Sequence, residues 1–158
     1  MESLTVERLR NIVLLSHGGA GKTSLAESLL FATGAISRMG RVEDGNTTSD
    51  YEPEEVKRES STQMSLIPCL WNDYKINVID TPGYADFLGE VIAGLRVADG
   101  GVVLVAAPSG IEVGTEQMWD LLDKQSAPRI VFVNKMDREN ADFLRTVDAL
   151  QQRFGRAC

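Results

Sequence analysis

Three short polar segments of the sequence combine residue types that bind nucleotides, and each follows an apolar run. The first, SHGGAGKTS (residues 16–24), crowds three glycines ahead of a lysine and a threonine. Its glycines allow the backbone to turn N–H groups inward around a phosphate, and the positive end of a following helix adds to that attraction. Lys22 would then contact the β- and γ-phosphates, and the Thr23 hydroxyl would ligate Mg²⁺. The alternative, a flexible glycine turn with an exposed lysine, fits the strand–loop–helix order less well.

The second segment, DTPG, begins at Asp80 directly after the apolar run KINVI. A carboxylate that follows a buried strand in this way can hold Mg²⁺, usually through a water molecule. Gly83 is free to rotate its N–H toward a γ-phosphate and so to sense its presence. Alone, the segment is equally well explained as a turn, so the metal-binding interpretation depends on the first segment.

The third segment, NKMD (residues 134–137), follows the run IVFV and indicates which base is bound. The Asp137 carboxylate can accept two hydrogen bonds from guanine, at N1–H and the 2-amino group. Adenine offers no such pair and would leave the carboxylate unpaired, at a cost of about 1–3 kcal/mol. Asn134 can bond the Hoogsteen edge, and the Lys135 stem can lie over the ring. A helix-capping loop is the alternative, but the three segments in this order predict a GTP site.

A weaker candidate ends the polar stretch 35–60, in KRESSTQMS. The hydroxyl groups of Ser60, Ser61 and Thr62 could join the Mg²⁺ shell when GTP is bound. Such a segment would be ordered by the γ-phosphate and released after hydrolysis. An ordinary Ser/Thr-rich surface loop explains these residues equally well.

The composition is that of one soluble globular domain: 158 residues, 43% hydrophobic and 25% charged. The net charge of −7 argues against broad or sequence-specific nucleic-acid binding by this segment. Cys69 and Cys158 are too few for a disulfide framework, which favours a reduced, cytoplasmic compartment. Because the longest apolar run is too short to span a bilayer and no export signal is visible, we expect no membrane association.

Apolar strands alternate with amphipathic helices along the chain, which predicts an α/β domain with a mostly parallel sheet. Asn72-Asp73 reads as a tight hairpin turn, and Pro68 places its strand at an edge. The expected strands are 11–15, 64–71, 74–80, 102–106 and 130–133. The expected helices run from Lys22 to near Gly34, over 87–98, after Thr115, and along an apolar face of Phe143, Leu144, Val147 and Leu150, with a long loop over 35–60. Ligands of such sheets bind beyond the C-terminal strand ends.

With these motifs in place, the sequence resembles the translational GTPases, and within them elongation factor G and its paralogous elongation factor G-like group. The resemblance covers essentially the whole chain, through NIVLLSHGGAGKTSLAESLLF, SDYEPEEVKRE, INVIDTPGYADFLGEV, GIEVGTE and VNKMDRENADF. It implies a small-G-protein-like P-loop NTPase fold with a mixed, mostly parallel sheet and flanking helices. It also implies bound GTP or GDP with Mg²⁺. The nucleotide-binding residues would be His17, Gly18, Gly19, Ala20, Gly21, Lys22, Thr23, Ser24, Asp80, Gly83, Asn134, Lys135 and Asp137.

The same resemblance assigns Mg²⁺ to Thr23, Asp80 and Ser61, with Thr62 as the alternative to Ser61. Catalysis would fall to Lys22, Gly83 and Tyr84.

Several residues depart from the family pattern. Ser16 occupies the first position of the phosphate loop, where related factors tolerate a small residue. Gly19 replaces a frequent Asp, and Ser60 replaces an apolar residue. Tyr84 follows DTPG where the usual residue is a His that positions the attacking water. A phenol is a poor general base at neutral pH, but it can orient water by hydrogen bonding. A tyrosine here is typical of the elongation factor G-like group.

The resemblance implies a ribosome-stimulated GTPase that acts in translocation, with the ribosome and GTP as partners. Two alternatives remain: a ribosome-associated switch with slow hydrolysis, and a ribosome-protection or peptide-release GTPase of the same superfamily. Residues 1–158 would form the N-terminal part of the GTP-binding domain, C-terminally incomplete, without its final base-contacting loop, last strand and downstream domains. Because the IVFV strand would then have an uncovered edge, we expect these residues alone to bind GTP weakly or to aggregate.

Overall fold

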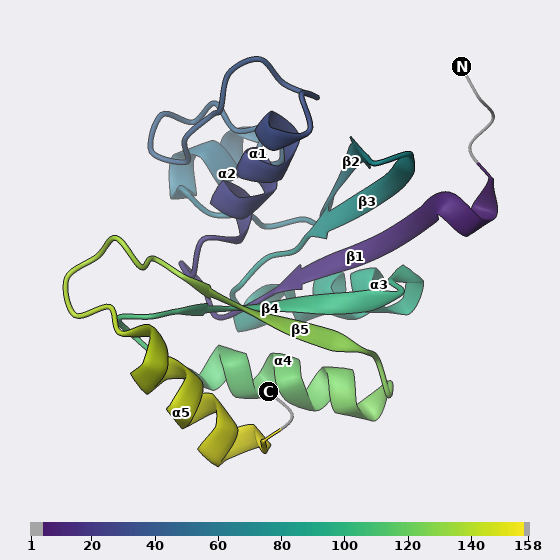
Figure 1. The fold of residues 1–158 in the computed structure, drawn as a ribbon. Helices are drawn as coiled ribbons and strands as arrows, with labels where there is room; N and C mark the ends of the chain where they lie inside the picture. Colours follow the sequence, from purple (N-terminus) through teal and green to yellow (C-terminus); the bar gives the residue numbers. More distant parts are fainter. Residues whose placement is uncertain (1–4, 157–158) are drawn as a thin grey trace.

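In the computed structural model, which describes residues 5–156, the strands form one five-stranded sheet in the order β2-β3-β1-β4-β5 (Figure 1). Its strands are β1 (Leu9–Leu15), β2 (Ser65–Trp71), β3 (Tyr74–Asp80), β4 (Gly100–Ala106) and β5 (Arg129–Asn134). β1 pairs in parallel with β3 and β4, and β4 with β5, whereas β2 pairs antiparallel with β3. The expected α/β fold with a mostly parallel sheet is confirmed.

The β2–β3 hairpin explains the one antiparallel pair. Asn72 and Asp73 both have positive φ, 47° and 65°, the conformation that a two-residue hairpin turn requires. Pro68 lies in β2, an edge strand of the sheet, where its missing N–H costs no central hydrogen bond. Both sequence predictions are confirmed.

Helices cover both faces of the sheet (Figure 1). They are α1 (Lys22–Ala32), α2 (Pro53–Arg58), α3 (Leu88–Val97), α4 (Val113–Lys124) and α5 (Phe143–Phe154), with 3₁₀ turns η1 (Val6–Arg8) and η2 (Ala85–Phe87). Alternating strand residues supply two apolar clusters: Val13 and Val103 face α3 and α4, whereas Leu14 and Leu104 face α1. Because α1 and α3 pack on the sheet through these clusters, the loops that join β1 to α1 and β3 to α3 are held at the ends of their strands.

Two helix predictions need correction. The stretch 35–60, expected as a loop, contains α2, which starts at Pro53 and is capped by reciprocal contacts between Glu52 and Glu55. Six residues are too few to show a helical repeat of apolar positions, so only the capping signal could have revealed it. Helix α4 begins at Val113 and not after Thr115, because the Thr115 hydroxyl accepts a hydrogen bond from the Glu112 amide at 3.3 Å within the first turn.

The predicted apolar face of α5 is only partly buried. Leu150 is 2% exposed, but Leu144 is 73% exposed and Phe143 51%. The helix instead packs on α4 through its end, where the rings of Trp119 and Phe154 stack with centroids 4.1 Å apart.

Apolar side chains also remain exposed along β5, the other edge strand, where Ile130 is 65% exposed and Phe132 40%. Exposed apolar edges promote association between molecules. This exposure agrees with the expected aggregation of the isolated 158 residues, which stays a prediction.

Cys69 is buried in β2 as a free thiol, and Cys158 lies outside the described residues. None of the helices within residues 5–156 has the length and apolar character needed to cross a membrane.

Candidate functional site

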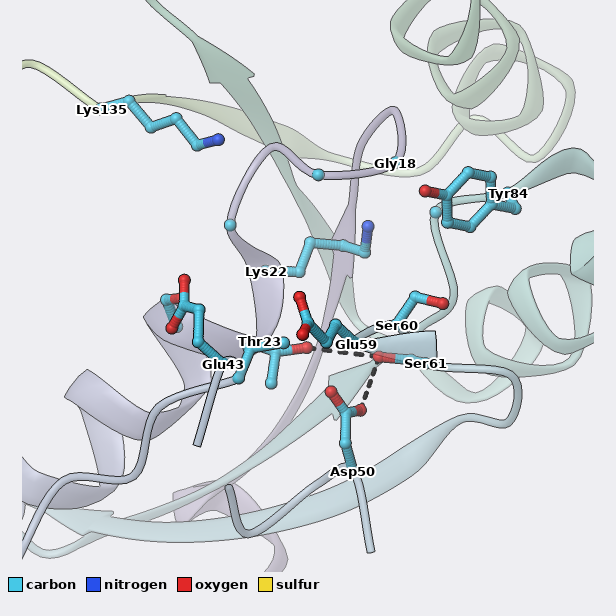
Figure 2. A pocket seen from close by; sticks show the side chains of 15 residues that line it. Gly18, Lys22, Thr23, Glu43, Asp50, Glu59, Ser60, Ser61, Tyr84 and Lys135 are labelled. Carbon is cyan, nitrogen blue, oxygen red and sulfur yellow. Dashed lines mark hydrogen bonds between the residues drawn. The ribbon is translucent and has the colours of Figure 1, made fainter. Parts of the chain in front are cut away.

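The loops that follow β1, β3 and β5 meet at one end of the sheet and border a cavity of about 230 Å³ (Figure 2). The segment before β2 closes its remaining side. The lining residues are Gly18, Gly19, Gly21, Lys22, Thr23, Ser24, Val42, Glu43, Asp50, Glu59, Ser60, Ser61, Gly83, Tyr84 and Lys135. Most of the residues predicted from the first two motifs are therefore brought together.

Gly21 sets the shape of the loop after β1. Its φ of 98° is left-handed, and a Cβ there would lie 2.5 Å from Nδ2 of Asn134, so a side chain would be excluded twice over. The same Nδ2 donates a hydrogen bond to the Ala20 carbonyl at 2.9 Å. Asn134, predicted as a base contact, thus also ties the loop after β5 to the phosphate loop.

Lys22 is buried, and its Nζ donates to the Ser16 hydroxyl at 2.8 Å. Ser16 in turn donates to the His17 carbonyl at 2.7 Å. Ser16, the departure at the first loop position, therefore holds the lysine. Burial lowers the pKa of Lys22 to about 8, although Asp80 and Asp50 act in the opposite direction. A buried ammonium with so little solvation gains stability from an anion placed in the cavity.

Gly83 brings the loop after β3 against the phosphate loop. A Cβ at Gly83 would lie 2.6 Å from Nζ of Lys22 and 2.8 Å from Cα of Gly18. Any larger residue would displace the ammonium or the loop, so the glycine permits this close approach.

Thr23 is the centre of a cluster of oxygen atoms. Its Oγ1 donates to Oδ2 of Asp80 at 2.9 Å and lies 3.3 Å from Oγ of Ser61. Ser61 donates to Oδ1 of Asp50 at 2.7 Å (Figure 2). Thr23, Asp80 and Ser61, the three predicted metal ligands, therefore form one connected cluster, and Asp50 is a member that the sequence reasoning missed.

Several oxygens of this region lack a protein partner within residues 5–156: Oδ1 of Asp80, Oδ2 of Asp50, and the hydroxyls of Thr47 and Ser49. Burial raises the pKa of Asp80 to about 6, against the effect of Lys22, and burial also raises the pKa of Asp50. Buried, unpaired carboxylate oxygens beside hydroxyls are the donor set that hard divalent cations prefer. The residues present therefore fit Mg²⁺.

Ser61 and Thr62 face different partners, which separates the two candidate ligands. The amide and the hydroxyl of Thr62 contact Oε1 of Glu55, at 2.8 and 3.3 Å, and so does the Gln63 amide, at 3.0 Å. Glu55 is only 1% exposed. This buried carboxylate of α2 therefore anchors the segment after it and leaves Ser61 directed to Thr23.

Replacing Glu55 with glutamine should loosen that segment. The substitution removes the charge from three hydrogen bonds, each worth about 1.5–3 kcal/mol when charged. We expect amide hydrogen exchange over residues 59–64 to accelerate about tenfold or more. The exposed Glu54, paired with Arg58, provides the matched control, and Glu54→Gln should leave this exchange unchanged. Equal exchange in both variants would contradict the anchoring role.

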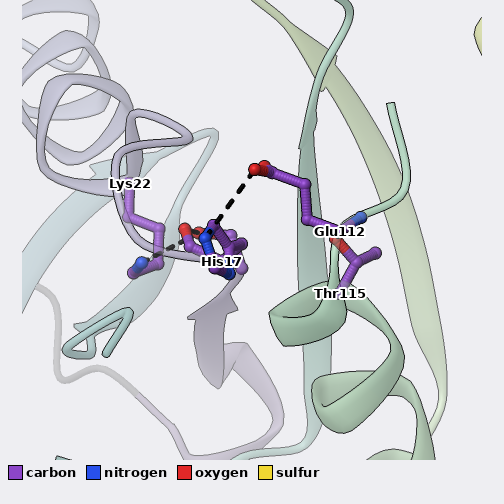
Figure 3. Close-up of polar contacts among 5 residues, drawn as sticks. His17, Lys22, Glu112 and Thr115 are labelled. Carbon is purple, nitrogen blue, oxygen red and sulfur yellow. Dashed lines mark hydrogen bonds and ion pairs between the residues drawn. The ribbon is translucent and has the colours of Figure 1, made fainter. Parts of the chain in front are cut away.

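Five of the predicted nucleotide contacts do not line the cavity: His17, Ala20, Asp80, Asn134 and Asp137. His17 turns toward α4, where its Nε2 lies 3.7 Å from Oε1 of Glu112 (Figure 3). Asp137 projects beyond the rim, with an 81% exposed side chain 3.8 Å from Nε of Arg138. Lys135, in contrast, does line the cavity and has a left-handed φ of 58°. The base side of the site is therefore open to solvent.

Glu43 and Glu59 are further lining residues that sequence reasoning missed, and both turn carboxylates toward the cavity (Figure 2). Charged residues in a long polar stretch are expected to be exposed to solvent. No local spacing distinguishes the ones whose side chains line a cavity. Only the position of the stretch across the strand ends reveals them.

Comparison with known proteins agrees with this geometry. Residues 7–157 match the family model described as the elongation factor Tu GTP binding domain. The chain belongs to this family of translational GTPases. A Thermus thermophilus protein of known crystal structure has a TM-score of 0.89 and 39% sequence identity, over 92% of this chain and 22% of that one. The expected P-loop fold is confirmed.

Similar proteins that are longer than this chain include elongation factors G and a ribosome-releasing factor. Elongation factor G of Granulibacter bethesdensis is 41% identical over 98% of this chain and 22% of its own length. Ribosome-releasing factor 2, mitochondrial, of Candida dubliniensis is 43% identical over 98% of this chain and 19% of its own length. Elongation factor G of Salinibacter ruber is 43% identical over 97% of this chain and 22% of its own length. The chain thus spans about a fifth of these relatives.

Proposed function

We propose that this chain is the N-terminal part of the GTP-binding domain of an elongation factor G-like GTPase, which binds GTP with Mg²⁺ and hydrolyses it on the ribosome. The observation that carries the proposal is the convergence of Lys22, Thr23 and Ser61 on one cavity, with Asp80 hydrogen-bonded to Thr23 behind them and buried carboxylate oxygens left unpaired. Membership of the family supports guanine as the base.

In the proposed reaction, Lys22 binds the β- and γ-phosphates and the Gly83 N–H faces the γ-phosphate. Thr23, Ser61 and Asp80 would hold Mg²⁺, which neutralises charge on the phosphates when bound. The Tyr84 hydroxyl orients a water molecule, whose oxygen attacks the γ-phosphorus as the bond to the β-phosphate oxygen breaks, and the protons of the water stay with the phosphate that forms. The products are GDP and inorganic phosphate.

The segment before β2 is proposed to be the moving part of this cycle. Glu43 and Glu59 border the cavity, and their charges would repel a nucleotide polyphosphate in the arrangement seen here. GTP binding is therefore expected to turn these two carboxylates away and to order the segment around the cation, and hydrolysis to release it. In the intact protein that change would be passed to the ribosome-bound domains.

A second candidate role rests on one finding, the similarity to a ribosome-releasing factor. It keeps the same GTPase site but couples it to ribosome release rather than to translocation. Translocation and ribosome-release assays on the intact protein distinguish the two roles.

Titration of the intact protein with GTP and ATP, with and without Mg²⁺, tests the site itself. We expect a clear guanine preference that requires Mg²⁺, and GTP hydrolysis that accelerates on ribosomes. Equal affinity for both nucleotides would overturn the proposal. Hydrolysis that ribosomes do not change would overturn its activation step, and Tyr84→Phe with unchanged turnover would remove Tyr84 from the mechanism.

A further inference from the structure

Tyr84 forms the wall between two cavities. It borders the nucleotide-site cavity on one side. On the other side it borders a second cavity of about 280 Å³, lined by His17, Gly83, Tyr84, Ala85, Asp86, Val113, Gly114 and Gln117. The ring is therefore free to turn toward either space unless something fixes it. Its position decides whether the hydroxyl faces the nucleotide site.

Gly18 is the contact that fixes the ring on the side of the phosphate loop. A Cβ built at Gly18 would lie 3.1 Å from both Cε1 and Cζ of Tyr84 and 3.4 Å from Cδ1. The two shorter distances are below ordinary carbon–carbon contacts. The ring thus occupies the space into which a side chain at Gly18 would extend, and a methyl group there would push it outward by a few tenths of an ångström.

Backbone conformation gives no reason for glycine at this position. Gly19 and Gly21 have φ values of 76° and 98°, which favour glycine, but Gly18 is not among the residues with positive φ. Alanine could adopt its backbone without strain. What an alanine would change is the space that the Tyr84 ring occupies.

The orientation of the Tyr84 ring determines where its hydroxyl group lies. In Figure 2 the hydroxyl end of Tyr84 points toward the phosphate loop, on the side of the cavity that the Lys22 ammonium faces. Within the described part of the chain, Tyr84 is 52% exposed, so the ring is not locked in place by burial. A ring displaced from Gly18 would carry that hydroxyl away from the loop.

We propose that Gly18 is a positioning residue for Tyr84: its bare backbone seats the ring so that the hydroxyl faces the reacting phosphate. This inference rests on the proposed GTPase function and assigns to Gly18 and Tyr84 a joint role in it. Gly18 contributes through the absence of a side chain, and Tyr84 contributes the hydroxyl that orients water. Glycine at 18 and tyrosine at 84 are therefore energetically coupled.

A double-mutant cycle tests the pair, with Gly18→Ala and Tyr84→Ala made singly and together in the intact protein. Ribosome-stimulated GTP turnover and GTP affinity are measured for each. In the native background we expect Gly18→Ala to lower turnover about tenfold, because small misplacements of reacting groups are costly. In the Tyr84→Ala background the same change should alter turnover less than about twofold.

Gly89→Ala is the matched control, since a Cβ at Gly89 meets no heavy atom within 4 Å, and it should leave turnover unchanged. A Gly18→Ala loss of equal size in both backgrounds, or no loss in the native one, would overturn the inference. A second measurement does not depend on activity: the NMR shift of the Gly18 amide should move in Tyr84→Ala, because the aromatic ring lies beside Gly18. An unmoved shift would also overturn the inference. A native protein that hydrolyses no GTP while that shift does move would instead refute the proposed function.

Discussion

Replacing Asp137 with alanine is expected to abolish the preference for guanosine over adenosine triphosphate. The carboxylate is 81% exposed beyond the cavity rim, so it can accept both guanine N–H groups without first breaking a strong contact. Losing that pair of hydrogen bonds should weaken GTP binding about 10- to 100-fold. ATP makes no such pair, so its affinity should change less than about threefold.

The neighbouring Glu139 offers a control for this change, because it is an exposed acid in the same loop. Glu139→Ala removes the same charge from the surface but no predicted base contact, and should leave both affinities unchanged. Competition titrations with a fluorescent guanine nucleotide measure all three proteins. If Asp137→Ala and Glu139→Ala behaved alike, Asp137 would not select the base.

The second large effect is expected from Lys22→Ala. Lys22 is the buried cation of the cavity, held at 2.8 Å by the Ser16 hydroxyl and approached by the backbone of Gly83. Charge-assisted contacts from a desolvated ammonium to phosphate oxygens are each worth about 1.5–3 kcal/mol. We expect GTP affinity to fall about 100-fold or more.

Lys124→Ala is the control for Lys22→Ala, since Lys124 is exposed at the end of α4. It should bind GTP as the native protein does. Circular dichroism on both variants checks that the fold persists. GTP affinity within about threefold of native in a folded Lys22→Ala variant would show that the cavity is not the phosphate site.

The apolar periodicity of the sequence was sufficient to predict most of the fold. Strands such as 102–106 are apolar without interruption because helices bury both faces of a parallel sheet, and this pattern is visible locally. Turn chemistry at Asn72-Asp73 and Pro68 also acts locally, so the hairpin and its edge position were predictable. Helix α2 was missed because a six-residue helix shows no repeat and depends on its caps.

The phosphate loop, the strand-end Asp80 and the NKMD segment were predicted from residue type and spacing alone, because each is a short contiguous chemical pattern. Tertiary structure decided everything that depends on contacts between distant segments. It separated Ser61 from Thr62 by pairing the latter with the buried Glu55, brought Asp50 into the cluster of oxygen atoms around Thr23, and placed the Tyr84 ring beside Gly18. Such contacts join residues many positions apart, and their geometry is set by how helices pack on the sheet, which no local pattern encodes.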